Sequence, residues 1–151
     1  MNFEATQESV SQVLENNKLG VKERLDQVCE LLRTSNDYYT WVGFYFAVPE
    51  KRELHLKAFA GIPTDHTVIP FGKGICGQVA ESNQNFVVPD VAAQDNYIAC
   101  SIHVKAEIVV PLFKDGINIG QIDIDSNTPD PFSEKDEVFL TWVNTQVAKI
   151  L

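Results

Sequence analysis

The sequence predicts an α+β fold, in which helices are segregated to one face of an antiparallel sheet. Two observations favour it: amphipathic helical stripes lie toward both ends of the chain, and β-branched and aromatic runs separated by turn residues fill the middle. With 151 residues, of which 44% are hydrophobic and 22% charged, residues 1–151 are expected to form one globular domain. The other face of the sheet is then free to hold a ligand under loops.

Helical periodicity marks three segments. Residues 20–34 carry an apolar stripe, a shorter helix is expected from about Glu4 to Asn16, and a third helix closes the domain. Ser133 and Asp136 have the spacing of a capping box at the start of that last helix. The two longer stripes consist of Leu25, Val28, Cys29 and Leu32 and of Phe139, Trp142, Val143, Val147 and Ile150.

Strand signals fill the middle of the chain. Lys114-Asp115-Gly116 lies between two apolar runs, and Asp-Gly in that setting is the strongest short-range signal for a β-hairpin. A short helix is expected over Gly74–Asn83, and a polar segment, Ala92–Ala99, leads to Cys100. The expected strands are Thr40–Val48, Leu54–Phe59, Val68–Phe71, Phe86–Val91, Ala106–Phe113 and Ile117–Asp125.

Charge and cysteine content exclude several classes of function. Twelve basic and 21 acidic residues give a formal net charge of −9, without a basic stripe, so neither nucleic acid nor an anionic membrane is an expected partner. The N-terminus lacks the pattern of a signal peptide, and no apolar run approaches the ~18 residues of a membrane span. Three cysteines without a CxxC pair favour reduced thiols. We therefore expect a soluble, cytoplasmic protein.

Residues Gly72 to Gly77 match the dinucleotide-binding pattern GxGxxG, but their context refutes that function. A four-residue strand precedes them and a hairpin follows, whereas a Rossmann unit needs a long buried strand and parallel βαβ repeats. The glycines instead predict a tight start to a short helix with close backbone packing. Cys76 lies at the start of that helix, where the helix dipole is expected to lower the pKa of its thiol.

Three carboxylates and two aromatic residues are the candidate binding residues. Asp123 and Asp125 lie two apart and must share one sheet face, Glu107 begins the neighbouring strand, and Trp41 and Tyr45 share a face with Gly43. If these faces coincide, the cavity suits a ligand with an ammonium group and an apolar tail, such as a free amino acid. The alternative is that the acids are solvated strand ends and the aromatic residues are core. No metal site is predicted, since Mg²⁺ or Ca²⁺ needs more oxygen ligands than these acids supply.

Cys100 is the thiol expected to be accessible, because it follows a loop rather than a periodic run. Cys29 lies on a helical stripe, which is typical of an inert buried residue. His103 is close to Cys100 in sequence, but a histidine at this distance more often caps a loop than acts as a base. His66 and His55 are still weaker candidates for a catalytic role.

The segments WVGFYF, IPFGKGICG, DNYIAC, AEIVVPL, GQIDIDS and PFSEKDE resemble, in order and spacing, the GAF-domain free methionine-(R)-sulfoxide reductases over roughly residues 38–140. The resemblance implies an antiparallel sheet of about six strands with helices on one face, a pocket for free methionine sulfoxide, and a homodimer. It implies that Cys100 is the nucleophile and becomes a sulfenic acid, and that a thioredoxin-like or small-thiol donor supplies electrons without a cofactor. Glu107, Asp123 and Asp125 would hold the substrate amine and polarise the sulfoxide, and Trp41 and Tyr45 would line the pocket.

The chain departs from this family at one position that matters for turnover. The family usually carries a resolving cysteine four residues before the proline of IPFGKG, where this chain has His66, and Ser101 and Ala106 also differ from the usual residues. Resolution of the sulfenic acid would need Cys76 or an external thiol. Two alternatives stay open: a non-catalytic GAF domain that binds a free amino acid or similar ligand, and a structural or interaction module in which the acids have no role.

Overall fold

The described residues form a six-stranded sheet. The structure, a computed structural model, describes residues 1–98 and 101–151. The strand order is β3-β2-β1-β6-β5-β4, and every neighbouring pair is antiparallel, which confirms the predicted fold class. The strands are β1 Trp41–Val48, β2 Glu53–Ala60, β3 Val68–Pro70, β4 Phe86–Val88, β5 Ala106–Lys114 and β6 Ile117–Ser126.

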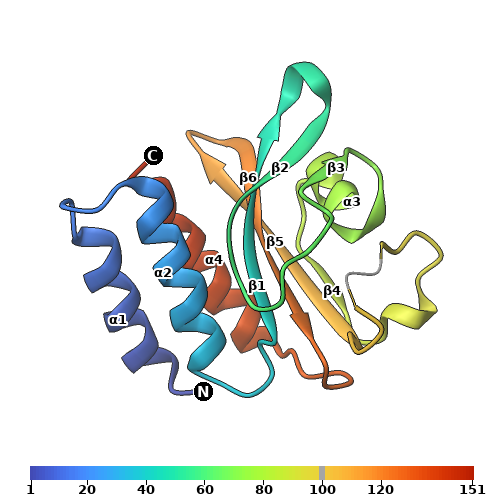
Figure 1. Cartoon of the computed structure of the whole chain (residues 1–151), viewed down its shortest axis with the longest axis horizontal. Helices are drawn as coiled ribbons and strands as arrows, with labels where there is room; N and C mark the ends of the chain where they lie inside the picture. Colours follow the sequence, from blue (N-terminus) through green and yellow to red (C-terminus); the bar gives the residue numbers. More distant parts are fainter. Residues whose placement is uncertain (99–100) are drawn as a thin grey trace.

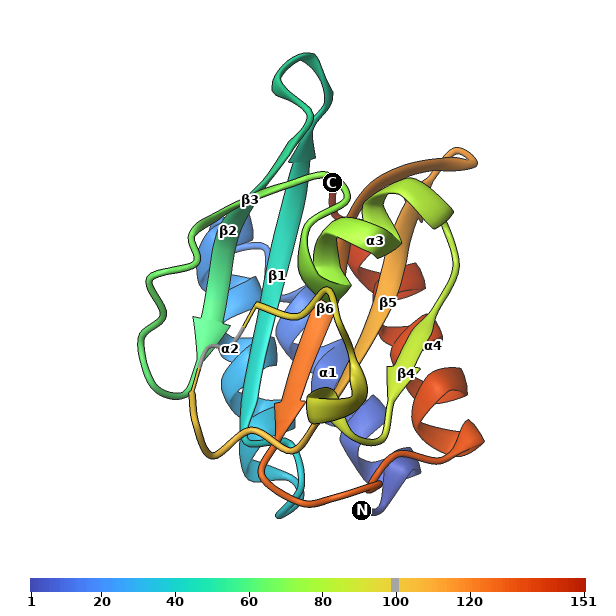
Figure 2. The same ribbon diagram turned by 90° about the vertical axis from the view of Figure 1, so that its right-hand side faces the viewer.

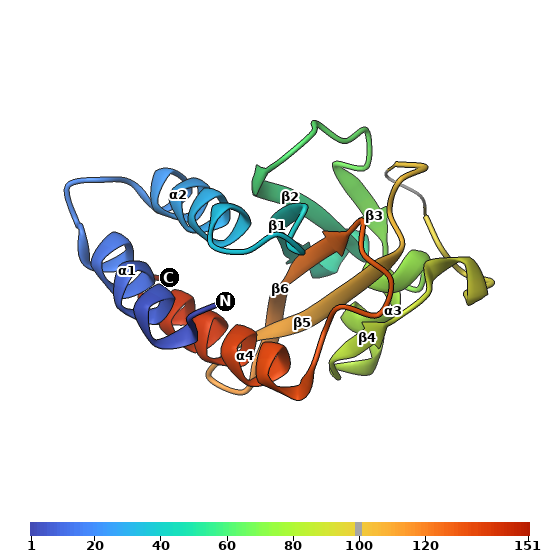
Figure 3. The same cartoon turned by 90° about the horizontal axis from the view of Figure 1, so that it is seen from below.

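Three of the four helices found in the described residues cover one face of this sheet. Helices α2 (Val21–Thr34) and α4 (Glu134–Ala148) pack on it and α1 (Phe3–Glu15) packs on these two helices, whereas α3 (Gly74–Ser82) lies on the opposite side (Figures 1 and 3). The predicted stripe of α2 is fully buried in the cluster between helices and sheet. Cys29 is part of this core, as predicted, and Trp142 packs against the cluster while staying partly exposed.

A second hydrophobic cluster lies on the other face of the sheet, beneath α3. It includes Trp41 and Tyr45 of β1, Ile75 and Cys76 of α3, and Val109 of β5. The close approach of α3 depends on glycine, because a Cβ atom at Gly77 would lie 2.6 Å from the carbonyl oxygen of Pro70. The sequence motif around Gly77 therefore serves packing, as predicted.

Local signals set the strand ends. Asp115 and Gly116 both have positive φ, and Lys114 pairs with Ile117, so the predicted two-residue hairpin turn is confirmed. The predicted strand Phe86–Val91 is wrong at its C-terminal end, since β4 stops at Val88. Pro89 lacks a backbone N–H for further pairing. The side chain of Asp90 instead accepts a hydrogen bond from the N–H of Ala92 and begins a 3-10 turn over Val91–Ala93.

The start of α4 is tied to the segment that leads into β1. Asp136 Oδ2 accepts the backbone N–H of Ser133 at 2.9 Å, so the capping carboxylate is where the sequence predicted it. Its Oδ1 atom accepts the hydroxyl groups of Tyr38 and Tyr39 at 3.0 and 2.7 Å. Burial and the neighbouring Asp136 raise the pKa of both tyrosines, which therefore stay neutral donors.

Among the described residues, no helix is both long and apolar enough to cross a membrane.

Candidate active site

Strand register brings the candidate residues to the face that carries α3. Asp125 pairs with Glu107 on one side and with Trp41 on the other, and Asp123 pairs with Gly43. Residues directly opposite one another in a ladder share a face, so the predicted coincidence of the two faces is confirmed. Figure 2 views the sheet from this side, with α3 in front of the strands and α1, α2 and α4 behind them.

The three carboxylates are buried rather than solvated. Glu107 is 6% exposed, and Asp123 and Asp125 are each 2% exposed, which rules out the interpretation that they are solvated strand ends. Burial disfavours the charged form of a carboxyl group and raises the pKa of Asp123, while hydrogen bonds with Glu107 and Cys76 partly oppose the change. Asp123 Oδ1 is buried without a hydrogen-bond partner among the described residues. The site thus contains a carboxyl group biased toward its neutral form.

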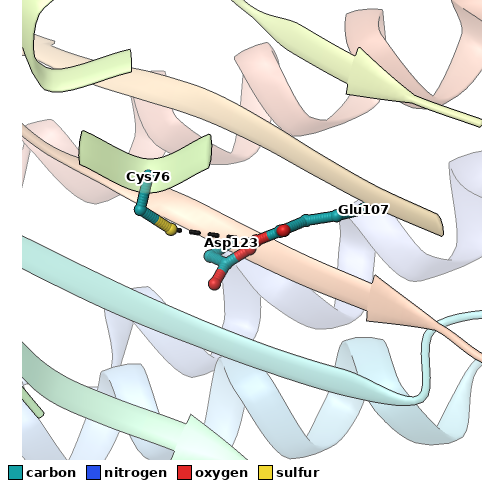
Figure 4. Close-up of side chains that lie close together, drawn as sticks. All are labelled: Cys76, Glu107 and Asp123. Carbon is teal, nitrogen blue, oxygen red and sulfur yellow. Dashed lines mark hydrogen bonds between the residues drawn. The ribbon is translucent and has the colours of Figure 1, made fainter. Parts of the chain in front are cut away.

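Cys76 projects from α3 toward these acids (Figure 4). Its Sγ atom lies 3.8 Å from Glu107 Oε2. Burial, followed by the nearby charges of Asp123 and Glu107, raises the pKa of the Cys76 thiol well above its usual range. The predicted thiolate is therefore wrong: a helix N-terminus favours an anion by only about 0.3–1 kcal/mol, and full desolvation of an ionisable group costs several times more.

The aromatic residues of β1 are both core residues and part of this face. The indole Nε1 of Trp41 donates to the carbonyl oxygen of Ile62 at 3.0 Å, and the ring stacks on Phe59 with centroids 5.9 Å apart. The hydroxyl of Tyr45 donates to the carbonyl oxygen of His66 at 2.7 Å. Trp41 and Tyr45 belong to the second hydrophobic cluster, so the two roles considered for them in the sequence are compatible.

Two cavities open onto the acidic face. Tyr45, His66, Cys76, Glu107 and Asp123 help to line one with a volume of about 10 Å³. That is about the room one water molecule needs, so a free amino acid requires neighbouring side chains to shift. The second has a volume of about 60 Å³ and is lined by Thr40, Trp41, Ile62, Thr64, Ser101, His103, Val104, Asp125 and Asn127.

The remaining predicted residues divide between this site and other parts of the fold. Cys100, the predicted nucleophile, lies outside the described residues. His66 lines the cavity that contains Cys76, and His103 lines the neighbouring cavity. His55 is 3.3 Å from Glu53 on β2, and neither residue lines those two cavities, in keeping with its weak claim.

Sequence reasoning missed Gln121, which is fully buried on the same face. Its Nε2 atom donates to the carbonyl oxygen of Cys76 at 3.1 Å and so fixes the first turn of α3 above the sheet. The sequence could have indicated this position, because Gln121, Asp123 and Asp125 are spaced two apart along β6 and so point to the same face of the sheet.

The fold is that of a GAF domain, and the family model described as "GAF domain" matches residues 18–151. GAF domain-containing protein A of Dictyostelium discoideum is 39% identical over 91% of this chain and 80% of its own length. The free methionine-R-sulfoxide reductase of Saccharomyces cerevisiae is 40% identical over 66% of this chain and 56% of its own length. The structure of the free methionine-R-sulfoxide reductase of Neisseria meningitidis in complex with its substrate is 34% identical. The match spans 98% of this chain and 87% of the Neisseria chain, with a TM-score of 0.91.

The chain therefore belongs to the GAF-domain free methionine-R-sulfoxide reductase family.

Proposed function

We propose that this chain reduces free methionine-(R)-sulfoxide to methionine. The observation that carries the proposal is the convergence of Glu107, Asp123 and Asp125 in buried positions on one sheet face beside Trp41. An ammonium group bound here would offset the cost of burying carboxylates, and the indole would contact the apolar part of the ligand. Relatives named free methionine-R-sulfoxide reductase support the choice of substrate.

The proposed first step is attack of the Cys100 thiolate on the sulfoxide sulfur. The sulfoxide oxygen is transferred to Cys100, which becomes a sulfenic acid, while the substrate sulfur gains two electrons and leaves as methionine. A neutral acid must protonate the oxygen as the sulfur–oxygen bond breaks. Asp123 fits this role, because burial raises its pKa and favours the protonated form. Glu107 and Asp125 are then the proposed partners of the substrate ammonium.

The proposed second step regenerates Cys100 with two external thiols. The first condenses with the sulfenic acid, forming a mixed disulfide and water, and the second releases Cys100 as its own sulfur joins the first in a disulfide. Cys76 is a poor resolving group in this arrangement, since its thiol is buried and its pKa is raised, and exchange requires a thiolate. His66 lines the cavity but cannot form a disulfide. A small thiol or a thioredoxin-like protein supplies the electrons.

An assay with the resolved enantiomers of free methionine sulfoxide tests this proposal. The (R) form should be reduced with dithiothreitol, and parallel reactions with thioredoxin should show whether a protein donor can replace it. Cys100→Ser should abolish reduction, whereas Cys29→Ala should leave it nearly unchanged. Cys29 lies in the hydrophobic cluster between the helices and the sheet, here called the helix-side core. Normal turnover by Cys100→Ser would contradict the mechanism.

Peptide mapping after one turnover tests the resolving step separately. Without added thiol, the expected product is Cys100 as sulfenic acid, which dimedone should trap. A disulfide between Cys76 and Cys100 would show that the chain resolves its own sulfenic acid.

A second candidate function is binding of a free amino acid without turnover. The observation in its favour is His66, which lines the acidic cavity and stands where the resemblance seen in the sequence implies a resolving cysteine. Calorimetry with methionine separates the two functions when it is read beside the assay. Binding without reduction of either enantiomer, by either thiol donor, would establish the non-catalytic function.

A further inference from the structure

A thiol and two carboxylates converge in the acidic cavity from three separate elements. Cys76 comes from α3, Glu107 from β5 and Asp123 from β6 (Figure 4). One ligand atom from each lies within 4.8 Å of the others, and all three residues are buried. Glu107 and Asp123 lie on the two strands of one hairpin, whereas α3 is distant from both in sequence, so the packing of α3 on the sheet completes the cluster.

The spacing matches that of a small tetrahedral cation. Zinc binds sulfur at about 2.3 Å and carboxylate oxygen at about 2.0–2.2 Å, so a sulfur and an oxygen bound to one tetrahedral ion lie about 3.6 Å apart. The observed separation of Cys76 Sγ and Glu107 Oε2 is 3.8 Å. An ion could therefore enter between these atoms with little movement of the backbone.

An independent feature of Asp123 also points to a missing ligand. Its Oδ1 atom is buried and has no hydrogen-bond partner in the part of the chain that the structure describes, although the residue lines the cavity. Buried polar atoms are normally satisfied by a partner. A bound cation would supply that partner.

We propose that Cys76, Glu107 and Asp123 bind a thiophilic divalent cation of the Zn²⁺ class. Sulfur and oxygen donors suit zinc, whereas Mg²⁺ and Ca²⁺ prefer six or more oxygen ligands. His66 lines the same cavity but is not one of the three residues whose ligand atoms lie within 4.8 Å, so its imidazole would have to move toward the ion to become the fourth ligand. Sequence reasoning missed the site because it considered only the acids, and Cys76 reaches them only through the fold.

Binding exchanges a proton for the metal. The Cys76 sulfur–hydrogen bond breaks, the proton passes to the buffer, and the sulfur–metal bond forms, since a coordinating thiol is deprotonated outright. A consequence follows that rests on the proposed function: the metal and the substrate ammonium compete for the same carboxylates. Zinc should then inhibit reduction of methionine sulfoxide, and a chelator should restore it.

Calorimetric titration of reduced, metal-free protein with Zn²⁺ tests the site without any substrate. The wild type should bind one ion per chain, and affinity should fall at least tenfold in Cys76→Ala and in Asp123→Asn. Cys29→Ala is the matched control, because it removes a thiol from the helix-side core, and its affinity should equal that of the wild type. Absence of binding, or equal affinity in Cys76→Ala, would overturn the proposal.

Co²⁺ gives a spectroscopic readout of the same site. A sulfur-to-cobalt charge-transfer band is expected in the wild type and in Cys100→Ser, and it should vanish in Cys76→Ala. A wild type without the band would overturn the proposal even if the Cys76 variant failed to fold. Because neither titration uses substrate, loss of the metal site and loss of the proposed reductase activity are measured separately.

Discussion

Replacing Gly43 with alanine tests how the aromatic wall of the acidic site is held in place. Gly43 lies directly opposite Asp123 in the sheet, and the indole of Trp41 folds over it. A Cβ atom at position 43 would lie 2.3 Å from Cη2 and 2.6 Å from Cζ3 of that ring. Both atoms belong to a rigid ring, so the whole indole must turn away.

The cost follows from the contacts that fix the indole. Its hydrogen bond to Ile62 is worth about 0.5–1.5 kcal/mol, and its stacking on Phe59 is worth about 0.5–1.5 kcal/mol. Losing both would cost about 1–3 kcal/mol, and the smaller conformational entropy of unfolded alanine returns about 0.4–1 kcal/mol. Gly43→Ala should therefore lower the free energy of unfolding by about 1.3 kcal/mol, the middle of a range of about 0–2.6 kcal/mol, and weaken methionine binding.

Urea unfolding followed by tryptophan fluorescence measures the first effect, and calorimetry with methionine measures the second. Gly20→Ala is the matched control, because a Cβ atom there meets its nearest neighbour, Glu23, at an ordinary 3.6 Å. Because Gly20 is the N-cap of α2, alanine there should cost up to about 1 kcal/mol of stability, but tryptophan fluorescence and methionine affinity should equal those of the wild type. If Gly43→Ala were equally stable, with unchanged fluorescence and affinity, the indole could not depend on the glycine beneath it.

Three further predictions concern the charged and redox groups of the site. Glu107→Gln or Asp125→Asn should weaken methionine binding by about 2 kcal/mol or more, measured by calorimetry, because the ammonium loses a buried partner; unchanged affinity would remove the acids from the binding site. His66→Cys should raise thioredoxin-dependent turnover if position 66 comes within disulfide distance of Cys100, and peptide mapping should then find that disulfide; a variant that forms it without a gain in rate would refute the explanation. The folded state holds the Asp123 proton more tightly than the unfolded state does, so wild-type stability should fall as pH rises from near the ordinary pKa of 3.8 through the raised pKa. Urea unfolding between pH 4 and 8 should show that fall, and Asp123→Asn should lack it; equal slopes would mean that Asp123 ionises normally.

Features that depend on neighbouring residues in the sequence were predictable. The stripe of α2, the Asp115-Gly116 turn and the Ser133–Asp136 cap each follow from spacing within a few residues. The shared face of the acids was predictable in part, because alternation along a strand fixes the direction of each side chain.

Features that depend on distant packing were not predictable. Proximity to a helix start indicated a lowered pKa for Cys76, but the actual direction depends on burial beneath α3 and on acids from β5 and β6. The hydrogen bond from Gln121 to the first turn of α3 likewise joins residues 45 positions apart. The position of Cys100, on which the proposed chemistry depends, lies outside the described residues.

The face of the sheet beneath α3 both packs a second hydrophobic cluster and carries the proposed site. The helix-side cluster consists of buried apolar residues, whereas the other face buries acids whose charged forms are costly there. Selection for the proposed chemistry would therefore act on the acids of that face and leave the helix-side cluster unchanged. A lineage could neutralise an acid such as Asp123, lose turnover and gain stability while keeping its core intact. The fold can in this way persist after the activity is lost, which is one physical route by which a reductase becomes a ligand-binding module.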